Sequence, residues 1–293
     1  MRYALYPGCT VQSEQYEYEM SVREVLPKLG IQLAELDGAG CCGYLSYRVS
    51  SPIGWKYLTA RNLALAEALS LDILTLCNNC HLSFSRVAND MEKDDELRKT
   101  LSEALTIEGL EYNGRTRALH ILEVLHDQIG RAKIAEKIEK PLKGLNLAAH
   151  PGCYLFRPTD LKRPDNGKEP KKLDELIRTL GAESSDYPEK LECCGSTISR
   201  VQEKASLLMA GSKLKAIKEH GFDGLVTICP HCFRIFDGRQ LEMQNLFSDD
   251  SIELPVFYYT QLLGLSMGIP PEKLGLELNN SPVEGLIERV LKN

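Results

Sequence analysis

The sequence predicts an α/β protein built from two duplicated halves, each with a parallel sheet and extra helices. Two observations predict it: the cysteine motifs occur twice in the same order, and short apolar runs alternate with longer segments of helical periodicity. The chain has 293 residues, about twice the length of an ordinary domain. We therefore place an N-terminal domain with a helical connector at residues 1–143 and a C-terminal domain at residues 144–293.

Ten cysteines divide equally between the halves, as a single cysteine, then Cys-Cys-Gly, then Cys-x-x-Cys. The first set is Cys9, Cys41, Cys42, Cys77 and Cys80, and the second set is Cys153, Cys193, Cys194, Cys229 and Cys232. From 41 to 193 and from 77 to 229 the shift is 152 residues, whereas from 9 to 153 it is 144. This register indicates an internal duplication, with eight additional residues that we place in the polar loop 163–170.

Each half begins with an apolar run that ends at Pro-Gly, which predicts a strand, and continues into a periodic segment that ends near a glycine, which predicts a helix. Short segments then lead to the Cys-Cys-Gly loops, long helical patterns follow, and a buried strand and a helix flank each Cys-x-x-Cys. In this order the segments are 3–6, 14–29, 31–36, 52–71, 72–76 and 80–88 in the first half, and 145–149, 171–180, 182–187, 201–220, 224–228 and 232–240 in the second. Because every cysteine motif then follows a strand, right-handed crossovers should bring the motifs to the carboxyl edge of each sheet.

The connector and the tail are less distinctive. Residues 90–143 are charged and helical in pattern, and residues 91–96 predict an exposed surface turn. A strand at 255–259 and helices at 261–267 and 283–291 should complete the second core.

The charge balance excludes several classes of function. Lys and Arg number 35 and Asp and Glu number 41, which gives a net charge of -6 and argues against a nucleic-acid or lipid-headgroup surface. The chain has no apolar run of roughly 18 residues and no signal-peptide pattern at its N-terminus. We therefore expect no nucleic-acid partner, no membrane insertion and a cytoplasmic protein, in which thiols stay reduced.

Five sulfur donors in each half favour a polynuclear iron–sulfur cluster, which has several irons to satisfy and prefers sulfur ligands. Disulfides need an oxidising compartment, and a tetrahedral zinc ion takes four ligands and leaves one thiol over. A thioredoxin-type pair at Cys77 and Cys80 would give the other three cysteines of the set no role. Two structural zinc sites remain as an alternative.

No second cofactor is expected in this chain. Residues 38–43 read Gly-Ala-Gly-Cys-Cys-Gly, which elsewhere holds a dinucleotide pyrophosphate, but the second copy lacks the first two glycines and two thiols occupy the turn. There is also no ferredoxin-type cysteine run. We expect neither flavin nor NAD here, so electrons must come from a partner.

The doubled motif set resembles the duplicated CCG-domain family, and in length and order the B subunits of methanogen-type heterodisulfide reductases. The resemblance implies two Rossmann-like CCG domains and two non-cubane 4Fe–4S clusters, one held by each cysteine set. It implies a catalytic role in reducing the coenzyme M–coenzyme B disulfide to two thiols between the clusters. The implied partners are the ferredoxin-like C subunit, the flavin-containing A subunit, and hydrogenase or formate dehydrogenase upstream.

The same family includes iron–sulfur subunits of glycolate-, lactate- and succinate-oxidising complexes and of sulfur-oxidation complexes. The alternative function is therefore electron transfer within such an oxidoreductase complex, because the motifs alone do not separate these relatives.

Five further side chains are candidates for the site. Arg48 and Arg200 each follow a Cys-Cys pair by six residues, and with Lys204 they could bind a small anionic disulfide or, for the arginines, anchor the loop. His81 and His231 adjoin the Cys-x-x-Cys motifs and could donate a proton or simply pack. We expect the two cysteine sets to face each other across a pseudo-twofold interface with a shared cavity.

Overall fold

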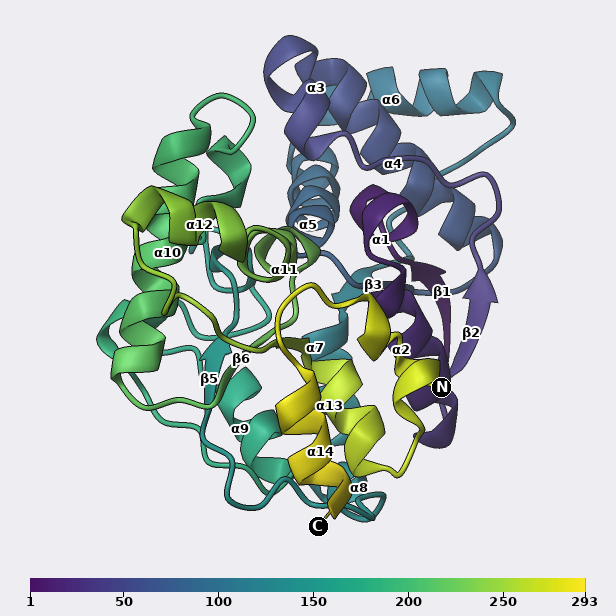
Figure 1. Ribbon diagram of the computed structural model, residues 1–293. Helices are drawn as coiled ribbons and strands as arrows, with labels where there is room; N and C mark the ends of the chain where they lie inside the picture. The colour runs from purple at the N-terminus through teal and green to yellow at the C-terminus, as the bar shows by residue number, and fades with distance from the viewer. Residues whose placement is uncertain (293) are drawn as a thin grey trace.

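The computed structural model describes residues 1–292 and contains one parallel sheet in each half (Figure 1). The first sheet has the order β2-β1-β3-β4, with strands Arg2–Tyr6 (β1), Gln32–Glu35 (β2), Ile73–Thr75 (β3) and Ala118–His120 (β4). The second has the order β5-β6-β7, with strands Leu147–His150 (β5), Gly224–Thr227 (β6) and Val256–Tyr258 (β7). The predicted α/β class with two parallel sheets is confirmed.

Helices surround both sheets. In the first half they are Cys9–Glu14 (α1), Tyr16–Lys28 (α2), Tyr44–Ser50 (α3), Pro52–Ala68 (α4), Asn78–Lys93 (α5), Asp95–Ile107 (α6), Ile121–Glu123 (α7), the π-helix Val124–Ile129 and Arg131–Ala135 (α8). In the second half they are Lys172–Thr179 (α9), Glu203–Glu219 (α10), Pro230–Gly238 (α11), Gln240–Phe247 (α12), Tyr259–Ser266 (α13) and Glu284–Lys292 (α14). Short 3-10 turns lie at Cys153–Leu155, Pro188–Leu191, Ser196–Ile198, Pro271–Leu274 and Leu276–Leu278.

Three local expectations differ from the structure. The predicted helix 14–29 is broken at Gln15, which leaves helical geometry (φ -142°, ψ 59°) and pairs its buried side chain with the Tyr258 hydroxyl of the second half. Residues 182–187 contribute only an isolated bridge, Asn146 with Glu183, so the second sheet has one strand fewer than the first. Strand β4 was not predicted, because three residues are too few to show a period.

The predicted exposed turn at 91–96 is exposed from Glu92 to Glu96, but it is a junction between two helices rather than a turn. Helix α5 continues to Lys93, and Met91 is buried in the same apolar cluster as Leu101 of α6. Asp94 forms the junction and caps α6 by accepting a hydrogen bond from the Leu97 amide at 3.0 Å. The run of charges therefore marks a helix N-terminus, where acidic residues are favourable.

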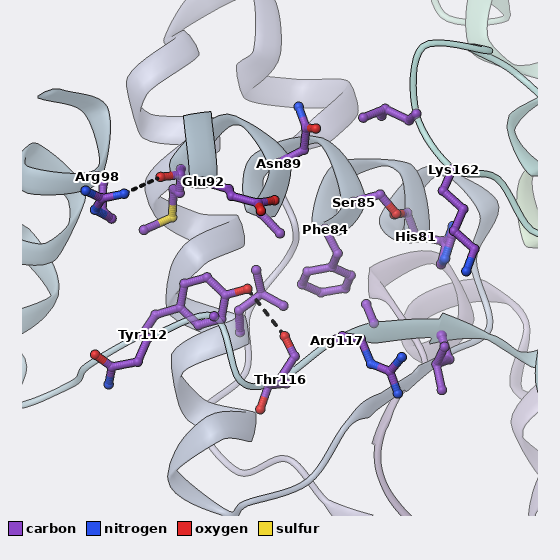
Figure 2. A pocket seen from close by; sticks show the side chains of 18 of the residues that line it. His81, Phe84, Ser85, Asn89, Glu92, Arg98, Tyr112, Thr116, Arg117 and Lys162 are labelled. Carbon is purple, nitrogen blue, oxygen red and sulfur yellow. Dashed lines mark hydrogen bonds between the residues drawn. The ribbon is translucent and has the colours of Figure 1, made fainter. Parts of the chain in front are cut away.

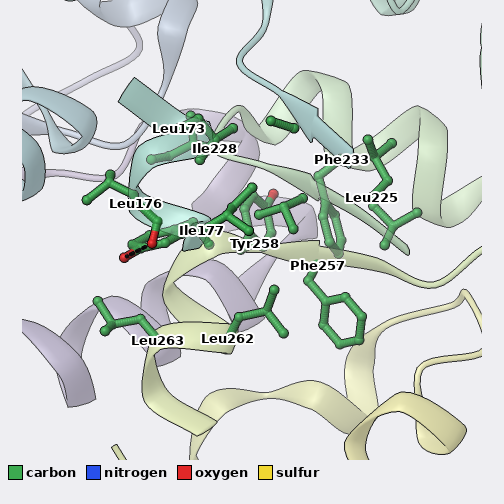
Figure 3. Packing of buried hydrophobic residues seen from close by; sticks show 14 of the residues in the cluster. Leu173, Leu176, Ile177, Leu225, Ile228, Phe233, Phe257, Tyr258, Leu262 and Leu263 are labelled. Atoms are coloured by element: carbon green, nitrogen blue, oxygen red, sulfur yellow. Dashed lines mark hydrogen bonds between the residues drawn. The ribbon is translucent and has the colours of Figure 1, made fainter. Parts of the chain in front are cut away.

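The larger hydrophobic core is shared by both halves, and the residues labelled in Figure 3 belong to the part that the second half contributes. Tyr18 of α2 stacks on Tyr258 at 3.8 Å between ring centroids, and Phe233 of α11 stacks on Tyr258 at 4.0 Å. The Ser21 and Thr260 hydroxyls hydrogen-bond at 2.7 Å between α2 and α13. Because these contacts between α2 and the second half are buried, they fix the two halves relative to each other. The division of the chain into two domains between residues 143 and 144 stays a prediction.

Within residues 1–292, no helix has both the length and the apolar character needed to cross a membrane.

Replacing Phe257 by Ala should lower the free energy of unfolding by about 3–5 kcal/mol, because the side chain is fully buried in β7 and leaves a cavity (Figure 3). Urea denaturation of the metal-free protein measures the change. Ile107→Ala is the control, since Ile107 is 87% exposed and its loss should leave the unfolding midpoint almost unchanged. Equal losses in the two variants would contradict the burial of Phe257 in the core.

Glu17→Gln should stabilise the protein more at pH 8 than at pH 5. Burial raises the pKa of Glu17 to about 7, with a further increase from Asp237. An acid whose folded pKa is raised favours folding while it is protonated, and this contribution is lost as the pH rises from about 4.5 through 7. Thermal melts at the two pH values measure the difference. Exposed Glu103→Gln is the control, and an equal gain at both pH values would contradict the expectation.

Candidate metal centres

In the first half, three neighbouring parallel strands each lead into one cysteine motif. Strand β1 ends before Cys9, β2 before Cys41 and Cys42, and β3 before Cys77 and Cys80. The carboxyl ends of parallel strands lie at one edge of a sheet, so residues distant in sequence meet there. In the second half, β5 and β6 lead into their motifs in the same way, whereas a 3-10 turn precedes Cys193 and Cys194.

The sulfur atoms converge without forming disulfides. The Sγ atoms of Cys9 and Cys41 lie 3.6 Å apart and those of Cys42 and Cys80 lie 3.4 Å apart, well beyond the length of a disulfide bond. In the second half, Cys194 and Cys232 meet a ring nitrogen of His150, with all three atoms within 4.8 Å of one another. All ten cysteines are free thiols.

Glycine allows the adjacent cysteines to serve one site. Successive side chains of an extended chain point to opposite faces, so the chain must turn sharply at each Cys-Cys pair. Gly43 (φ 76°) and Gly195 (φ 78°) are left-handed, a conformation that glycine adopts without strain. Their amides donate to the Sγ atoms of Cys41 and Cys193, each at 3.3 Å.

Two further glycines make room for sulfur. Gly8 (φ 89°) and Gly152 (φ 78°) precede the first cysteine of each set. A Cβ at Gly8 would lie 3.2 Å from the Cys80 Sγ, and a Cβ at Gly152 would lie 2.6 Å from the Asn78 side-chain nitrogen and 3.3 Å from the Cys232 Sγ. Each site is thus a cradle of close-packed sulfur donors with space reserved around it. This donor set suits a thiophilic metal centre such as an iron–sulfur cluster.

The thiols of the first set differ strongly in how readily they ionise. Hydrogen bonds from Cys41 and Cys80 lower the pKa of Cys42 to about 5. The neighbouring Cys41 thiol and burial raise the pKa of Cys9 far above its usual range. Sulfurs this close do not all ionise alone, so a positively charged metal centre is what would make all five thiolates.

A cavity of about 330 Å³ lies between the halves. All five cysteines of the first set line it, and the second half contributes Arg200, His231 and Arg234. No cysteine of the second set is among its described lining residues. This cavity joins the two halves but borders only the first cysteine set, so it is not the cavity shared by both sets that the sequence analysis expected.

Direct contacts hold the second half against the first set. His231 lies beside Cys77, and the Asn78 side-chain amide donates to the Pro151 carbonyl at 2.9 Å. Burial lowers the pKa of His231, but the contact with Cys77 and the charges of Cys77 and Cys229 outweigh burial and raise it. His231 therefore lines the cavity, and its role as a proton donor stays a prediction.

Three other predicted site residues lie apart from this cavity. Arg48 is exposed, and its guanidinium carbon lies 4.8 Å from the centroid of the Tyr44 ring, which itself lines the cavity. Lys204 is exposed at the start of α10. His81 lines a different cavity, of about 1070 Å³, beside α5 (Figure 2). There its Nε2 lies 3.3 Å from Glu123 and its Nδ1 lies 3.1 Å from Arg163, a residue of the additional loop.

Two buried polar residues near the second set were not predicted. They are His150 at the end of β5 and Lys213 of α10. The sequence does carry a signal for Lys213, because it falls on the same helix face as Ala210, Leu214 and Ile217, which are buried. A lysine on an apolar helix face is a departure from the amphipathic pattern.

Comparisons with known proteins agree with this architecture. The family model for the cysteine-rich domain CCG matches the chain twice, at residues 3–85 and 147–237. Over 279 residues the chain is 34% identical to the B subunit of the ferredoxin/F420H2-dependent CoB-CoM heterodisulfide reductase of Methanosarcina acetivorans, covering 94% of this chain and 92% of that protein. It is 29% identical to the membrane anchor subunit of the 8-methylmenaquinol:fumarate reductase of Wolinella succinogenes, covering 94% and 96%.

Among solved structures, a hypothetical protein from Helicobacter pylori shares the fold, with a TM-score of 0.77 and 16% identity over 96% of this chain and 52% of that one.

Adding a methyl group at the sulfur cradles should displace metal. We expect Gly8→Ala and Gly152→Ala each to lower the iron bound after anaerobic reconstitution by about half, because each added Cβ presses against a sulfur of one set, and at Gly152 also against the Asn78 side chain. Gly114→Ala is the matched control: it has φ 76°, but nothing lies within 4 Å of its added Cβ. It should cost roughly 1–2 kcal/mol of stability and keep its iron. Equal iron loss in all three variants would show that backbone strain alone is responsible.

Proposed function

Because the chain belongs to the CCG cysteine-rich domain family, we propose that it is an iron–sulfur component of a reductase complex and that it reduces the CoB-CoM heterodisulfide. One observation carries the proposal: five free cysteines of the first set line a cavity that also contains two arginines and a histidine of the second half. The Methanosarcina relative, by its name, supports the choice of substrate.

Each cysteine set would hold one non-cubane 4Fe–4S cluster. The ligands would be Cys9, Cys41, Cys42, Cys77 and Cys80 for the first, and Cys153, Cys193, Cys194, Cys229 and Cys232 for the second. When bound, such clusters supply one-electron transfer and a metal with affinity for sulfur. Two clusters match the two electrons that cleavage of one disulfide requires.

The chain's own residues would bind and protonate the substrate. Reduction of R-S-S-R' to two thiols consumes two electrons and two protons, and breaks the single S–S bond. Arg200 and Arg234 line the cavity and provide positive charge for an anionic substrate, although Arg234 also pairs with Glu14 at 3.2 Å. His231 lines the cavity, where it would donate a proton to a nascent thiolate. At about 330 Å³ the cavity has the size of a small-molecule site.

The electrons would enter from partner proteins of the same complex. We propose that a ferredoxin-like C subunit is the direct donor and that a flavin-containing A subunit supplies it, since the sequence offers no other redox motif. The Methanosarcina relative is itself a B subunit, which supports a place in a larger complex.

A second candidate function is electron transfer within an organic-acid reductase. The relative from Wolinella belongs, by its name, to a fumarate reductase, and the alignment covers 94% of this chain. The cavity borders the first cysteine set, which supports a role for the second set in passing electrons. In this function neither cluster would meet a disulfide.

Metal analysis of the anaerobically purified protein tests the cofactor, and an assay with CoB-CoM disulfide and a reduced viologen dye tests the substrate. We expect iron and acid-labile sulfide, with thiols produced from the disulfide. Zinc without sulfide would contradict the clusters. Full iron and sulfide without disulfide reduction, with or without the partner proteins, would favour the electron-transfer function.

Arg200→Ala should raise the KM for the disulfide about 10- to 100-fold, because it removes a charge-assisted contact with the substrate from the cavity. Iron content should stay at the wild-type level, since Arg200 is not a sulfur donor. Lys215→Ala removes a charge that pairs with Asp249, away from the cavity, and should leave KM unchanged. An unchanged KM in Arg200→Ala would remove this arginine from the binding site.

A further inference from the structure

We propose that Lys213 and His150 make the second metal centre easier to reduce than the first, by placing a buried positive charge and an N–H donor beside Cys194 and Cys232. The inference rests on the proposed function, because it concerns the clusters that the two cysteine sets would hold. It assigns a difference between two sites that the cysteine motifs make identical.

Lys213 is a fully buried ammonium group with neutral partners. Its Nζ donates to the carbonyls of Lys190 at 3.1 Å and Glu192 at 2.7 Å, and to the Nδ1 of His150 at 3.1 Å. A charge in such a place is costly unless an opposite charge compensates it. Burial lowers the pKa of Lys213 to about 8, and the charges of Cys232 and Cys194 act in the opposite direction. The thiolates of the second set are thus the nearby anions that would stabilise it.

His150 connects this charge to the sulfurs. A ring nitrogen of His150 lies within 4.8 Å of both the Cys194 and Cys232 Sγ atoms, and the side chain is 2% exposed. Because Lys213 only donates, the Nδ1 of a neutral His150 must accept, and the ring proton then resides on Nε2. Within residues 1–292 this Nε2 is buried without a hydrogen-bond partner. The His150 ring thus has an unused N–H, and one of its nitrogens lies near two sulfur donors, so it is suited to hydrogen-bond to a bound cluster.

The first set has neutral side chains in the corresponding places. Tyr6 precedes Pro-Gly-Cys as His150 does, and its hydroxyl donates to the Gly40 carbonyl at 2.7 Å. Asn62 of α4 donates to the same carbonyl at 3.1 Å. Gly40 precedes its Cys-Cys pair as Glu192 does, so Asn62 and Lys213 support the same turn in the two halves. A side chain that supports this turn is therefore present in both halves, but only Lys213 of the second half carries a charge.

A positive charge and hydrogen bonds to sulfur both favour the more negative, reduced state of an iron–sulfur cluster. The second centre should therefore accept an electron at a higher potential than the first. An electron that enters the protein would reside at the second centre, while the first borders the cavity. The duplicated sites would thereby have different roles.

A reductive titration of the reconstituted protein, followed by EPR and visible absorption, tests the inference. The wild-type protein should show two midpoint potentials. Lys213→Gln keeps a side chain that can donate to the carbonyls but removes the charge, so it should lower the higher potential, leave the other unchanged and retain full iron. Lys213→Arg keeps the positive charge and should therefore keep the wild-type potential.

Asn62 provides the matched controls. Asn62→Leu removes the equivalent support without a change of charge, so it should shift a potential less than Lys213→Gln does. Asn62→Lys introduces the charge at the first site and should raise the lower potential. If the Lys213 variants lose iron, this variant still tests whether a buried charge at this position raises the potential. Two equal potentials in iron-replete wild-type protein, or an unchanged pair in Lys213→Gln, would overturn the inference alone. A wild-type protein without iron would instead overturn the proposed function.

Discussion

The structure depends on bringing five sulfur donors from three separate strand ends to one edge of a parallel sheet. In the first half, β1, β2 and β3 are neighbours and parallel, so their carboxyl ends fix where each cysteine motif begins. Close approach then depends on glycine, because Gly8 must avoid the Cys80 sulfur and Gly43 must turn the Cys-Cys pair. The close packing of the sulfur atoms therefore depends on the backbone conformation of these two glycines.

The candidate substrate cavity belongs to neither half alone. The stacked rings of Tyr18, Tyr258 and Phe233 hold α2 of the first half against the second core. This packing brings His231 and Arg200 over the first cysteine set. A duplicated pair of sulfur sites thus becomes an asymmetric arrangement, in which one set faces a cavity whose basic side chains come from the other half.

The two copies also differ in what surrounds the sulfurs. The second set has a buried lysine and histidine where the first has Asn62 and Tyr6, and the additional loop places Arg163 against His81. Duplication retained the donors and their turns, while the surrounding charges diverged. In iron–sulfur proteins such surroundings adjust the potential without changing the ligands.

The sequence by itself determined the repeat, the order of strand and motif, and the ten sulfur donors, because these are local patterns with a fixed register. Only the tertiary structure decided that Arg200 lines the cavity while Lys204 lies outside it, that His81 faces a different cavity, and that Gln15 breaks a helix to reach Tyr258. These outcomes depend on how helices from opposite halves pack. Such contacts join residues far apart in the chain, and no periodicity within either segment encodes them.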